Sequence, residues 1–262
     1  MEMDIRNLTF SYDGRRDIFR HISLVYRSPE ILCILGANGT GKSTLLKCLT
    51  GEHKAREGGV YIDGTDVRNV PPRKLAHRIA YIAQSHLPAF PFRVLDIATM
   101  GRTSRIGCLA SPGESDREAA MENLRYLKIE HLWNTPYTDI SGGERQLVMI
   151  AAALTQEPEA LILDEPTSHL DFGNQYRFIR LVDRLREKGV GVMMTTHFPD
   201  HALELKGRTV LLKDGRIQAD GMAPDVINDE TMEELYQIEV NVRKFGDRSI
   251  CIPGPMNGEC ES

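Results

Sequence analysis

The sequence predicts an α/β fold in which helices cover a mainly parallel sheet and a helical segment interrupts the alternation. Short apolar strand segments alternate with helical segments near both ends of the chain, a pattern typical of parallel sheets. An apolar segment at 30–36 runs directly into a glycine-rich loop and a helix. Residues 85–155 instead contain helical segments and loops with little strand character.

Bulk composition excludes several classes of protein. The chain has 262 residues, 41% of them hydrophobic and 26% charged, as expected for a soluble globular protein with one large domain or a core plus a subdomain. A net charge of −5 without a long Lys/Arg run argues against a nucleic-acid partner. No apolar run reaches the ~20 residues of a membrane span, and we expect no signal peptide. The five scattered cysteines, with no CxxC, predict reduced thiols rather than a disulfide framework or a zinc site.

The first 84 residues predict strands interrupted by one helix. Segments 3–12 and 21–27 are rich in strand-forming residues and flank the polar turn 13–16. The short apolar segment 30–36 predicts a buried strand, and the following helix, 42–51, ends at a glycine. Two more strands are expected, at 58–64 and 78–84.

The middle of the chain predicts helices. Ser115 and Glu118 form a capping-box pattern for a helix over 116–129, in which apolar residues recur on one face. Ser141 and Glu144 form a second capping-box pattern before a nearly all-apolar helix.

Strands return after residue 155. Apolar segments 159–166 and 190–197 predict buried strands, with a helix over 172–189 between them. Segment 208–221 predicts a hairpin around Asp214 and Gly215. Short helices are expected at 201–207 and 229–238, and an irregular tail over 241–262, where Cys251 and Cys260 offer only a weak case for a redox or metal pair.

The loop after the strand at 30–36 reads GANGTGKST and matches G-x-x-x-x-G-K-[ST] in strand–loop–helix context. Glycines let backbone N–H groups turn toward phosphate oxygens, and the helix N-terminus favours negative charge. Lys42 is expected to reach the β- and γ-phosphates and the Ser43 hydroxyl to ligate Mg²⁺. The competing interpretation, a glycine-rich turn with a surface lysine, does not explain this context. The predicted nucleoside triphosphate site comprises Gly36, Ala37, Asn38, Gly39, Thr40, Gly41, Lys42, Ser43 and Thr44.

Two further strand ends carry candidate catalytic groups. Asp164 follows an apolar strand and fits a Mg²⁺-anchoring acid, and Glu165 beside it fits a base for hydrolysis. A solvated acidic turn is the alternative, which the phosphate loop disfavours. His197 ends another apolar strand, and strand ends of open α/β sheets meet at the ligand crevice. His197 and His201 do not match the spacing and flanking Glu of a metalloprotease pattern, so we predict no metal there.

The helix start at Ser141 carries two glycines that capping does not require. Gly142 and Gly143 weaken the first turn, because glycine is roughly 1 kcal/mol poorer than alanine in a helix interior. They also remove side chains where a phosphate must approach backbone N–H groups. This stretch therefore predicts a second phosphate contact.

Six motifs occur in the order found in ATP-binding cassette (ABC) ATPases, which the chain resembles over about residues 3–240: the phosphate loop, Gln84, SGGERQ, LILDEP, SHLD and TTH. Within that family, FPFRVLDIATMGR, TSHLDFGNQ and HFPDHA resemble the ATPases of importers for iron–siderophore, haem and cobalamin, and of the related molybdate importers. The resemblance implies a P-loop NTPase with a mixed sheet core, an antiparallel β subdomain and a helical subdomain.

The implied organisation is one ABC ATPase domain over 1–240. The core and β subdomain come from 1–84 and 156–240, the helical subdomain from 85–155, and the tail from 241–262.

The resemblance also implies roles for individual residues. Tyr12 resembles the aromatic residue that stacks on adenine, and Gln84 the glutamine that approaches Mg²⁺ and senses the membrane subunit. Glu165 resembles the catalytic base, and His197 the residue that couples it to the γ-phosphate. Asp171 resembles an aspartate that signals across a dimer. The stretch SGGERQ, with Ser141, Gly142, Gly143 and Gln146, resembles the helix start that faces the partner subunit's nucleotide.

The function implied by the resemblance is hydrolysis of ATP with Mg²⁺, which powers uptake of a metal complex through a separate membrane permease. Two copies would form a head-to-tail dimer around two ATP molecules, on the cytoplasmic face of the membrane, with a substrate-binding protein acting indirectly. Residues 85–102 are the expected permease-docking surface.

The alternatives are a molybdate or tungstate importer ATPase, a soluble ABC ATPase such as one of iron–sulfur cluster assembly, and a nucleotide-dependent switch, which Glu165 disfavours. DNA-repair and ribosome-acting relatives are disfavoured because neither a coiled-coil insertion nor a second cassette is visible.

Overall fold

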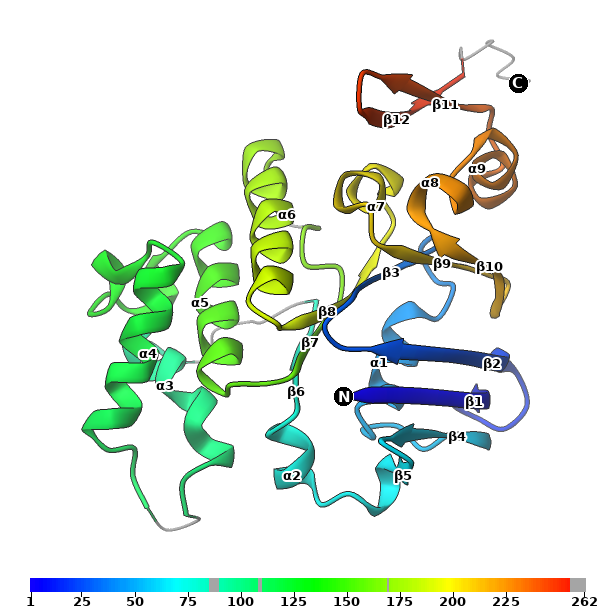
Figure 1. The fold of residues 1–262 in the computed structure, drawn as a ribbon. Coiled ribbons are helices and arrows are strands. Elements are labelled where there is room, and N and C mark those ends of the chain that lie inside the picture. Colours follow the sequence, from blue (N-terminus) through cyan, green and yellow to red (C-terminus); the bar gives the residue numbers. More distant parts are fainter. Residues whose placement is uncertain (85–89, 108–109, 169, 255–262) are drawn as a thin grey trace.

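A central sheet with helices on it occupies the middle of the computed structural model, which describes residues 1–84, 90–107, 110–168 and 170–254 (Figure 1). Its strand order is β10–β9–β3–β8–β7–β6, parallel except for the edge strand β10. The strands are β3 (Ile31–Leu35), β6 (Ile79–Ile82), β7 (Ala160–Leu163), β8 (Gly191–Thr196), β9 (Arg208–Lys213) and β10 (Arg216–Met222).

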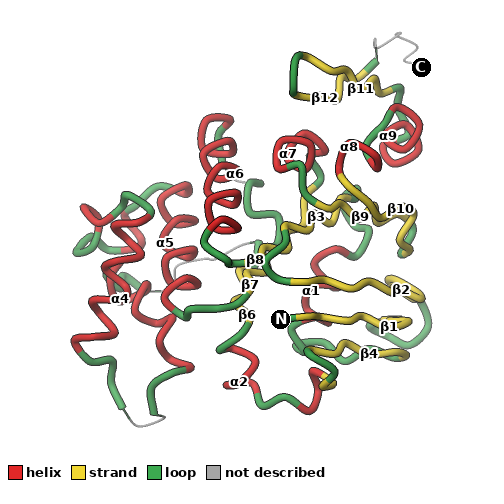
Figure 2. Tube along the Cα trace, in the orientation of Figure 1, coloured by secondary structure: helices red, strands yellow, loops and turns green. Residues whose placement is uncertain are grey.

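A second, antiparallel sheet has the order β2–β1–β4–β5 and lies against the central sheet (Figure 2). Its strands are β1 (Glu2–Ser11), β2 (Asp17–Arg27), β4 (Glu57–Ile62) and β5 (Thr65–Asp66). The β9–β10 turn at Asp214 and Gly215 has positive φ at both residues, as the sequence predicts for a hairpin.

The helices fall into two groups. α3, α4 and α5 pack on one another at one end of the molecule, away from the antiparallel sheet (Figure 1). The other helices lie on or beside the sheets. The α-helices are α1 (Lys42–Leu49), α2 (Pro72–Ala76), α3 (Val94–Thr99), α4 (Glu114–Tyr126), α5 (Gly142–Thr155), α6 (Phe172–Glu187), α7 (Pro199–Leu205), α8 (Ala223–Val226) and α9 (Asp229–Tyr236). Short 3₁₀ turns are η1 (Val67–Asn69), η2 (Met100–Ser104), η3 (Glu130–Leu132) and η4 (Tyr137–Asp139).

The central sheet separates two hydrophobic clusters. Along β3, Ile31, Cys33 and Leu35 point into the cluster beneath the helices, whereas Leu32 and Ile34 point into the cluster shared with the antiparallel sheet and α1. Successive side chains of a strand face opposite sides, so a strand covered on both faces is apolar throughout. This explains why the predicted strands read as continuous apolar runs.

The capping prediction for α4 is wrong in its position. The helix begins at Glu114, and the Asp116 carboxylate accepts a hydrogen bond from the backbone N–H of Gly113 at 2.9 Å. An acid placed three residues after the cap satisfies a free N–H and suits the helix dipole, which moves the start two residues upstream of the predicted capping box.

The predicted irregular tail is also wrong in part. Residues Val240–Phe245 (β11) and Arg248–Pro253 (β12) form an antiparallel hairpin. Its ordering depends on distant groups: the Asp200 carboxylate of α7 accepts from the N–H of Cys251 at 2.8 Å, and the Asp229 carboxylate of α9 accepts from the N–H of Val242 at 2.6 Å. Burial raises the pKa of the Cys251 thiol to about 12, so it stays protonated, while Cys260 lies outside the described residues.

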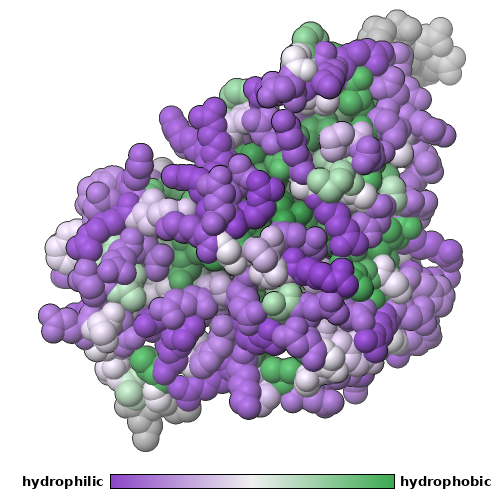
Figure 3. All heavy atoms as spheres, in the orientation of Figure 1, coloured by the Kyte–Doolittle hydropathy of each residue, from purple (hydrophilic) through white to green (hydrophobic). Residues whose placement is uncertain are grey.

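Within the described ranges, no helix has both the length and the apolar character needed to cross a bilayer. The face seen in Figure 3 is mostly hydrophilic, with hydrophobic atoms gathered in separate patches.

Candidate active site

The glycine-rich loop joins β3 to α1 in a conformation that requires glycine. Gly39 and Gly41 have φ of 80° and 94°, in the left-handed region that glycine adopts without strain. A Cβ atom on Gly36 would lie 2.6 Å from the backbone oxygen of Leu212 in β9. Among the described residues, no backbone N–H from Ala37 to Gly41 donates a hydrogen bond within the chain. The loop therefore presents free N–H donors at a helix N-terminus, an arrangement that fits a phosphate chain.

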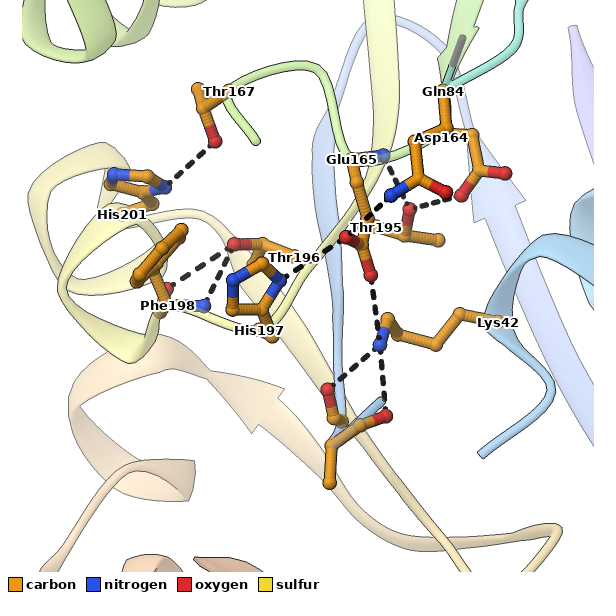
Figure 4. A network of polar contacts seen from close by, with 12 residues as sticks. Lys42, Gln84, Asp164, Glu165, Thr167, Thr195, Thr196, His197, Phe198 and His201 are labelled. Atoms are coloured by element: carbon orange, nitrogen blue, oxygen red, sulfur yellow. Dashed lines mark hydrogen bonds and ion pairs between the residues drawn. The ribbon is translucent and has the colours of Figure 1, made fainter. Parts of the chain in front are cut away.

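Lys42 is only 4% exposed, and its ammonium lies inside this loop. It donates to the backbone oxygens of Gly36 at 2.8 Å and Ala37 at 3.0 Å. Its third partner is the Glu165 carboxylate, 3.2 Å away (Figure 4). A strand end far along the sequence thus supplies the negative charge that balances the loop lysine.

The acidic pair at the end of β7 is fixed by a threonine of the neighbouring strand. The Thr195 hydroxyl donates to the Asp164 carboxylate at 2.7 Å and accepts from the backbone N–H of Glu165 at 2.8 Å. Asp164 is 3% exposed, and Glu165 has φ of 43°, an uncommon value for a residue other than glycine. Backbone in sparsely populated regions persists where surrounding contacts determine it, often at functional sites.

Two side chains converge on Glu165 from neighbouring segments. The Gln84 amide, just after β6, donates to the Glu165 Oε2 at 3.2 Å, and His197 Nδ1, just after β8, lies 3.2 Å from the same oxygen. Gln84, Glu165 and His197 also line a cavity of about 440 Å³ together with Lys42 and Ser43. The parallel sheet thus brings four of the predicted site residues to the loop, because these strands end at one edge.

Residues of α7 and α9 hold the segment that carries His197. The Tyr236 hydroxyl donates to the backbone oxygen of His197 at 2.7 Å, and burial raises the pKa of this phenol, which stays protonated. His201 packs one turn further on, 3.4 Å from the Thr167 hydroxyl (Figure 4). Burial, aided by the nearby His197, lowers the pKa of His201 to about 4. The sequence does not predict Thr195 or Tyr236 as parts of this site.

Tyr12 lies at the side of the loop. Its hydroxyl is 3.0 Å from the Thr44 hydroxyl, and its ring, 64% exposed, stands edge-on to Phe10 and His53. An exposed ring beside the loop can stack on a planar group of a ligand.

The Ser141 helix start lies elsewhere. The predicted capping box is present: the Ser141 hydroxyl accepts from the N–H of Glu144, and the Glu144 carboxylate from the N–H of Ser141, at 3.3 and 2.8 Å. None of Ser141, Gly142, Gly143 and Gln146 lines the cavities at the phosphate loop. Asp171 caps α6, where its carboxylate accepts from the N–H of Asn174 at 2.8 Å.

The residues present fit a magnesium nucleotide. Ser43 lines the cavity, and Asp164 keeps one carboxylate oxygen without a hydrogen bond from the described residues. Within the described chain, no group of three or more His, Cys, Asp or Glu side chains is placed to hold a metal. Mg²⁺ in nucleotide sites typically takes one or two protein ligands plus phosphate oxygens and water, which is what this site offers.

The family described as ABC transporter matches residues 19–168, more than half of the chain. The chain belongs to this family. An uncharacterized ABC transporter ATP-binding protein of Haemophilus influenzae is 37% identical, over 90% of each chain. The hemin import ATP-binding protein HmuV of Plesiomonas shigelloides is 34% identical, over 91% of this chain and 95% of its own. The molybdate import ATP-binding protein MolC of Haemophilus influenzae is 32% identical, over 90% and 88%.

Solved structures give the same result. A protein described as a metal-chelate type ABC transporter, in an inward-facing conformation, superposes with a TM-score of 0.85 at 30% identity, over 97% of each chain. A dimeric bacterial ABC transporter cassette superposes with a TM-score of 0.73 at 27% identity, over 84% of this chain and 98% of its own. The predicted ABC ATPase fold is confirmed. The chain belongs to the ABC ATPases, which are the ATP-hydrolysing subunits of transporters.

Proposed function

We propose that this ABC ATPase hydrolyses ATP with Mg²⁺ at the strand-end site and that Glu165 is the general base. The observation that carries this proposal is the convergence of Lys42, Gln84 and His197 on the Glu165 carboxylate. The Gln84 and His197 contacts orient the carboxylate beside the free N–H donors of the loop, and the Lys42 contact places it next to the lysine that binds phosphate. Ser43, Gln84 and Asp164 would hold Mg²⁺, which would neutralise phosphate charge.

Each site residue then has a separate role. Loop N–H groups and Lys42 bind phosphate oxygens, and Tyr12 stacks on the base. His197 orients the Glu165 carboxylate, which accepts the proton of the attacking water.

Replacement of Glu165 by Gln tests the base. Because Gln cannot accept this proton, we expect turnover to fall by about 100-fold or more while ATP binding is kept. The trapped nucleotide should also stabilise a dimer, detected by size-exclusion chromatography with ATP. Glu118→Gln, an exposed carboxylate on α4, is the control and should behave as wild type. Unchanged turnover in Glu165→Gln would remove Glu165 from this role.

We further propose that two copies bind ATP head-to-tail, with Ser141, Gly142, Gly143 and Gln146 facing the partner's nucleotide and Asp171 signalling between the copies. Gly142 supports this arrangement. Its φ is not positive and an added Cβ would meet nothing within 4 Å, so contacts within this chain do not require glycine there. A solved relative is dimeric. Ser141→Arg should therefore spare ATP binding and stop hydrolysis. A mixed dimer with one mutant copy that kept both sites fully active would contradict the arrangement.

The transport role needs a surface for a membrane permease dimer, and we propose the region of α3. Aromatic side chains are exposed there: Phe90 is 66% and Phe92 46% exposed, and their rings lie 6.0 Å apart. Residues 85–89 of the predicted docking surface lie outside the described residues. Phe90→Glu should abolish transport and co-purification with a polytopic membrane protein while keeping ATPase activity. Phe245→Glu, equally exposed on the distant C-terminal hairpin, is the control.

For the cargo we propose a metal complex of the iron–siderophore, haem or cobalamin class, delivered to the permease by a substrate-binding protein. The support is similarity along nearly the whole chain to a hemin import ATPase and to a metal-chelate type transporter. The similarity to a molybdate import ATPase favours molybdate as the second candidate. Stimulation of ATPase activity by the reconstituted permease with each cargo distinguishes the two candidates.

The proposed location is the cytoplasmic face of the membrane, where the permease would hold the ATPase. Fractionation tests this location against that of a soluble ABC ATPase.

A further inference from the structure

Apart from Gly143 and Gln146, the residues that line a groove between α4, α5 and α6 have no role in the proposed function. The groove's volume is about 720 Å³, larger than either cavity at the phosphate loop and within the roughly 300–1,000 Å³ range of small-molecule pockets. Its floor is apolar and comes from α5, α6, the residue that caps the end of α4 and the loop before α6: Leu127, Leu147, Leu170, Phe178 and Leu181.

The rim of the groove is cationic. Arg177, Arg180 and Arg184 recur on one face of α6, and Lys128 stands at the end of α4. Within the described part of the chain, none of these four cations has a carboxylate within 4.0 Å. The one carboxylate of the lining, Asp183, pairs with Arg186 at 2.6 Å. Positive charge at the rim is therefore unbalanced by the groove's own residues.

We propose that this groove binds a small amphipathic anion. Its apolar body would lie on the leucines and Phe178, and its carboxylate, sulfonate or phosphate would contact the arginines, which bind such groups with charge-assisted hydrogen bonds. We commit to a small molecule rather than a protein helix, because the groove's volume lies in the range of small-molecule pockets and cationic side chains line it.

The groove also joins two segments that the proposed function places at the contact between the two copies. Gly143, at the start of α5, lies against Asn174 of α6, and both line the groove; a Cβ on Gly143 would be 3.2 Å from the Asn174 amide nitrogen. An anion between these helices fixes their spacing. This step rests on the proposed role of Ser141–Gly143 in the dimer, and from it we expect the bound anion to lower the ATPase rate.

Binding is tested with 8-anilinonaphthalene-1-sulfonate, an amphipathic anion that fluoresces in apolar sites, on the full-length protein. N-phenyl-1-naphthylamine, which has the same rings without the sulfonate, is the neutral probe. Arg180→Glu removes a rim cation whose side chain has no hydrogen bond or ion pair to the described residues. Arg117→Glu on α4 makes the same change at an exposed arginine outside the groove, also without a described side-chain partner.

We expect one saturable sulfonate site, weakened about tenfold by Arg180→Glu and unchanged by Arg117→Glu, with the neutral probe insensitive to both. Equal effects of the two variants would overturn the proposal. Absence of saturable binding would overturn it too, and would favour a protein segment as occupant.

An ATPase assay tests the coupling of anion binding to turnover separately from the proposed function. The sulfonate should inhibit wild type and Arg117→Glu, whereas Arg180→Glu should keep its basal rate and lose sensitivity. Saturable binding without inhibition would refute the coupling alone. A wild-type protein without basal turnover, in the absence of probe, would instead refute the proposed function.

Discussion

Thr195→Val is expected to destabilise the protein although it keeps the shape of a fully buried side chain. The hydroxyl it removes joins Asp164 and the N–H of Glu165 at 2.7 and 2.8 Å. A hydrogen bond to a charged group contributes about 1.5–3 kcal/mol, and a buried N–H left without a partner costs about 1–3 kcal/mol. Together these give about 3–5 kcal/mol of unfolding free energy. At about 2–4 °C per kcal/mol for a chain of this size, Tm should fall by about 10 °C.

Differential scanning calorimetry without nucleotide measures this change. Thr209→Val is the matched control: Thr209 is also fully buried in the central sheet, but its hydroxyl has no hydrogen-bond partner among the described residues. Its replacement should be neutral or stabilising, since it removes an unsatisfied polar atom. Thr195→Ser keeps the hydroxyl and should lose only about 1 kcal/mol for the missing methyl. If Thr195→Val and Thr209→Val lower Tm equally, the hydroxyl bridge does not stabilise this site.

Three further changes have defined outcomes. Gly36→Ala should lower ATP affinity in equilibrium titrations by displacing the loop, because its Cβ would meet the Leu212 backbone oxygen at 2.6 Å; unaltered affinity would show that the loop tolerates the shift. Tyr236→Phe should lower kcat several-fold with little change in KM, because only the hydrogen bond to the His197 backbone is lost, and a change in KM alone would point to another role. The depressed pKa of His201 means that the unfolded state binds its proton first, so unfolding free energy should fall as pH drops from about 6.5 toward 4. His201→Phe should flatten this dependence in urea unfolding series, whereas an unchanged slope would assign it to other groups.

Features determined within a few residues were predictable from sequence. The loop ending at Lys42 needs glycines and a lysine at fixed offsets, and the reciprocal Ser141–Glu144 cap spans one helical turn. The β9–β10 hairpin depends on one Asp-Gly turn. Because the geometry of such motifs depends only on residues close in sequence, the sequence alone predicts them.

Features that depend on distant partners were not predictable in the same way. Thr195 looks like an ordinary strand residue until β7 and β8 pair and place its hydroxyl between two groups 30 and 31 residues away. Its one signal was a polar residue near the end of an apolar strand. The C-terminal hairpin is similar, since Asp200 and Asp229 from two helices satisfy its edge N–H groups. Roles that depend on a partner subunit remain proposals for the same reason.

The position of Lys42 has a consequence for how nucleotide enters. Its ammonium has three oxygen partners within the chain: Gly36, Ala37 and Glu165. An incoming phosphate must replace the Glu165 contact, so part of the intrinsic attraction between lysine and phosphate is used in separating an existing ion pair. The same exchange leaves the carboxylate without its cation only when phosphate has arrived. Nucleotide binding therefore frees the Glu165 carboxylate from Lys42, so the group that we propose as the base can turn to water only once phosphate lies in the loop.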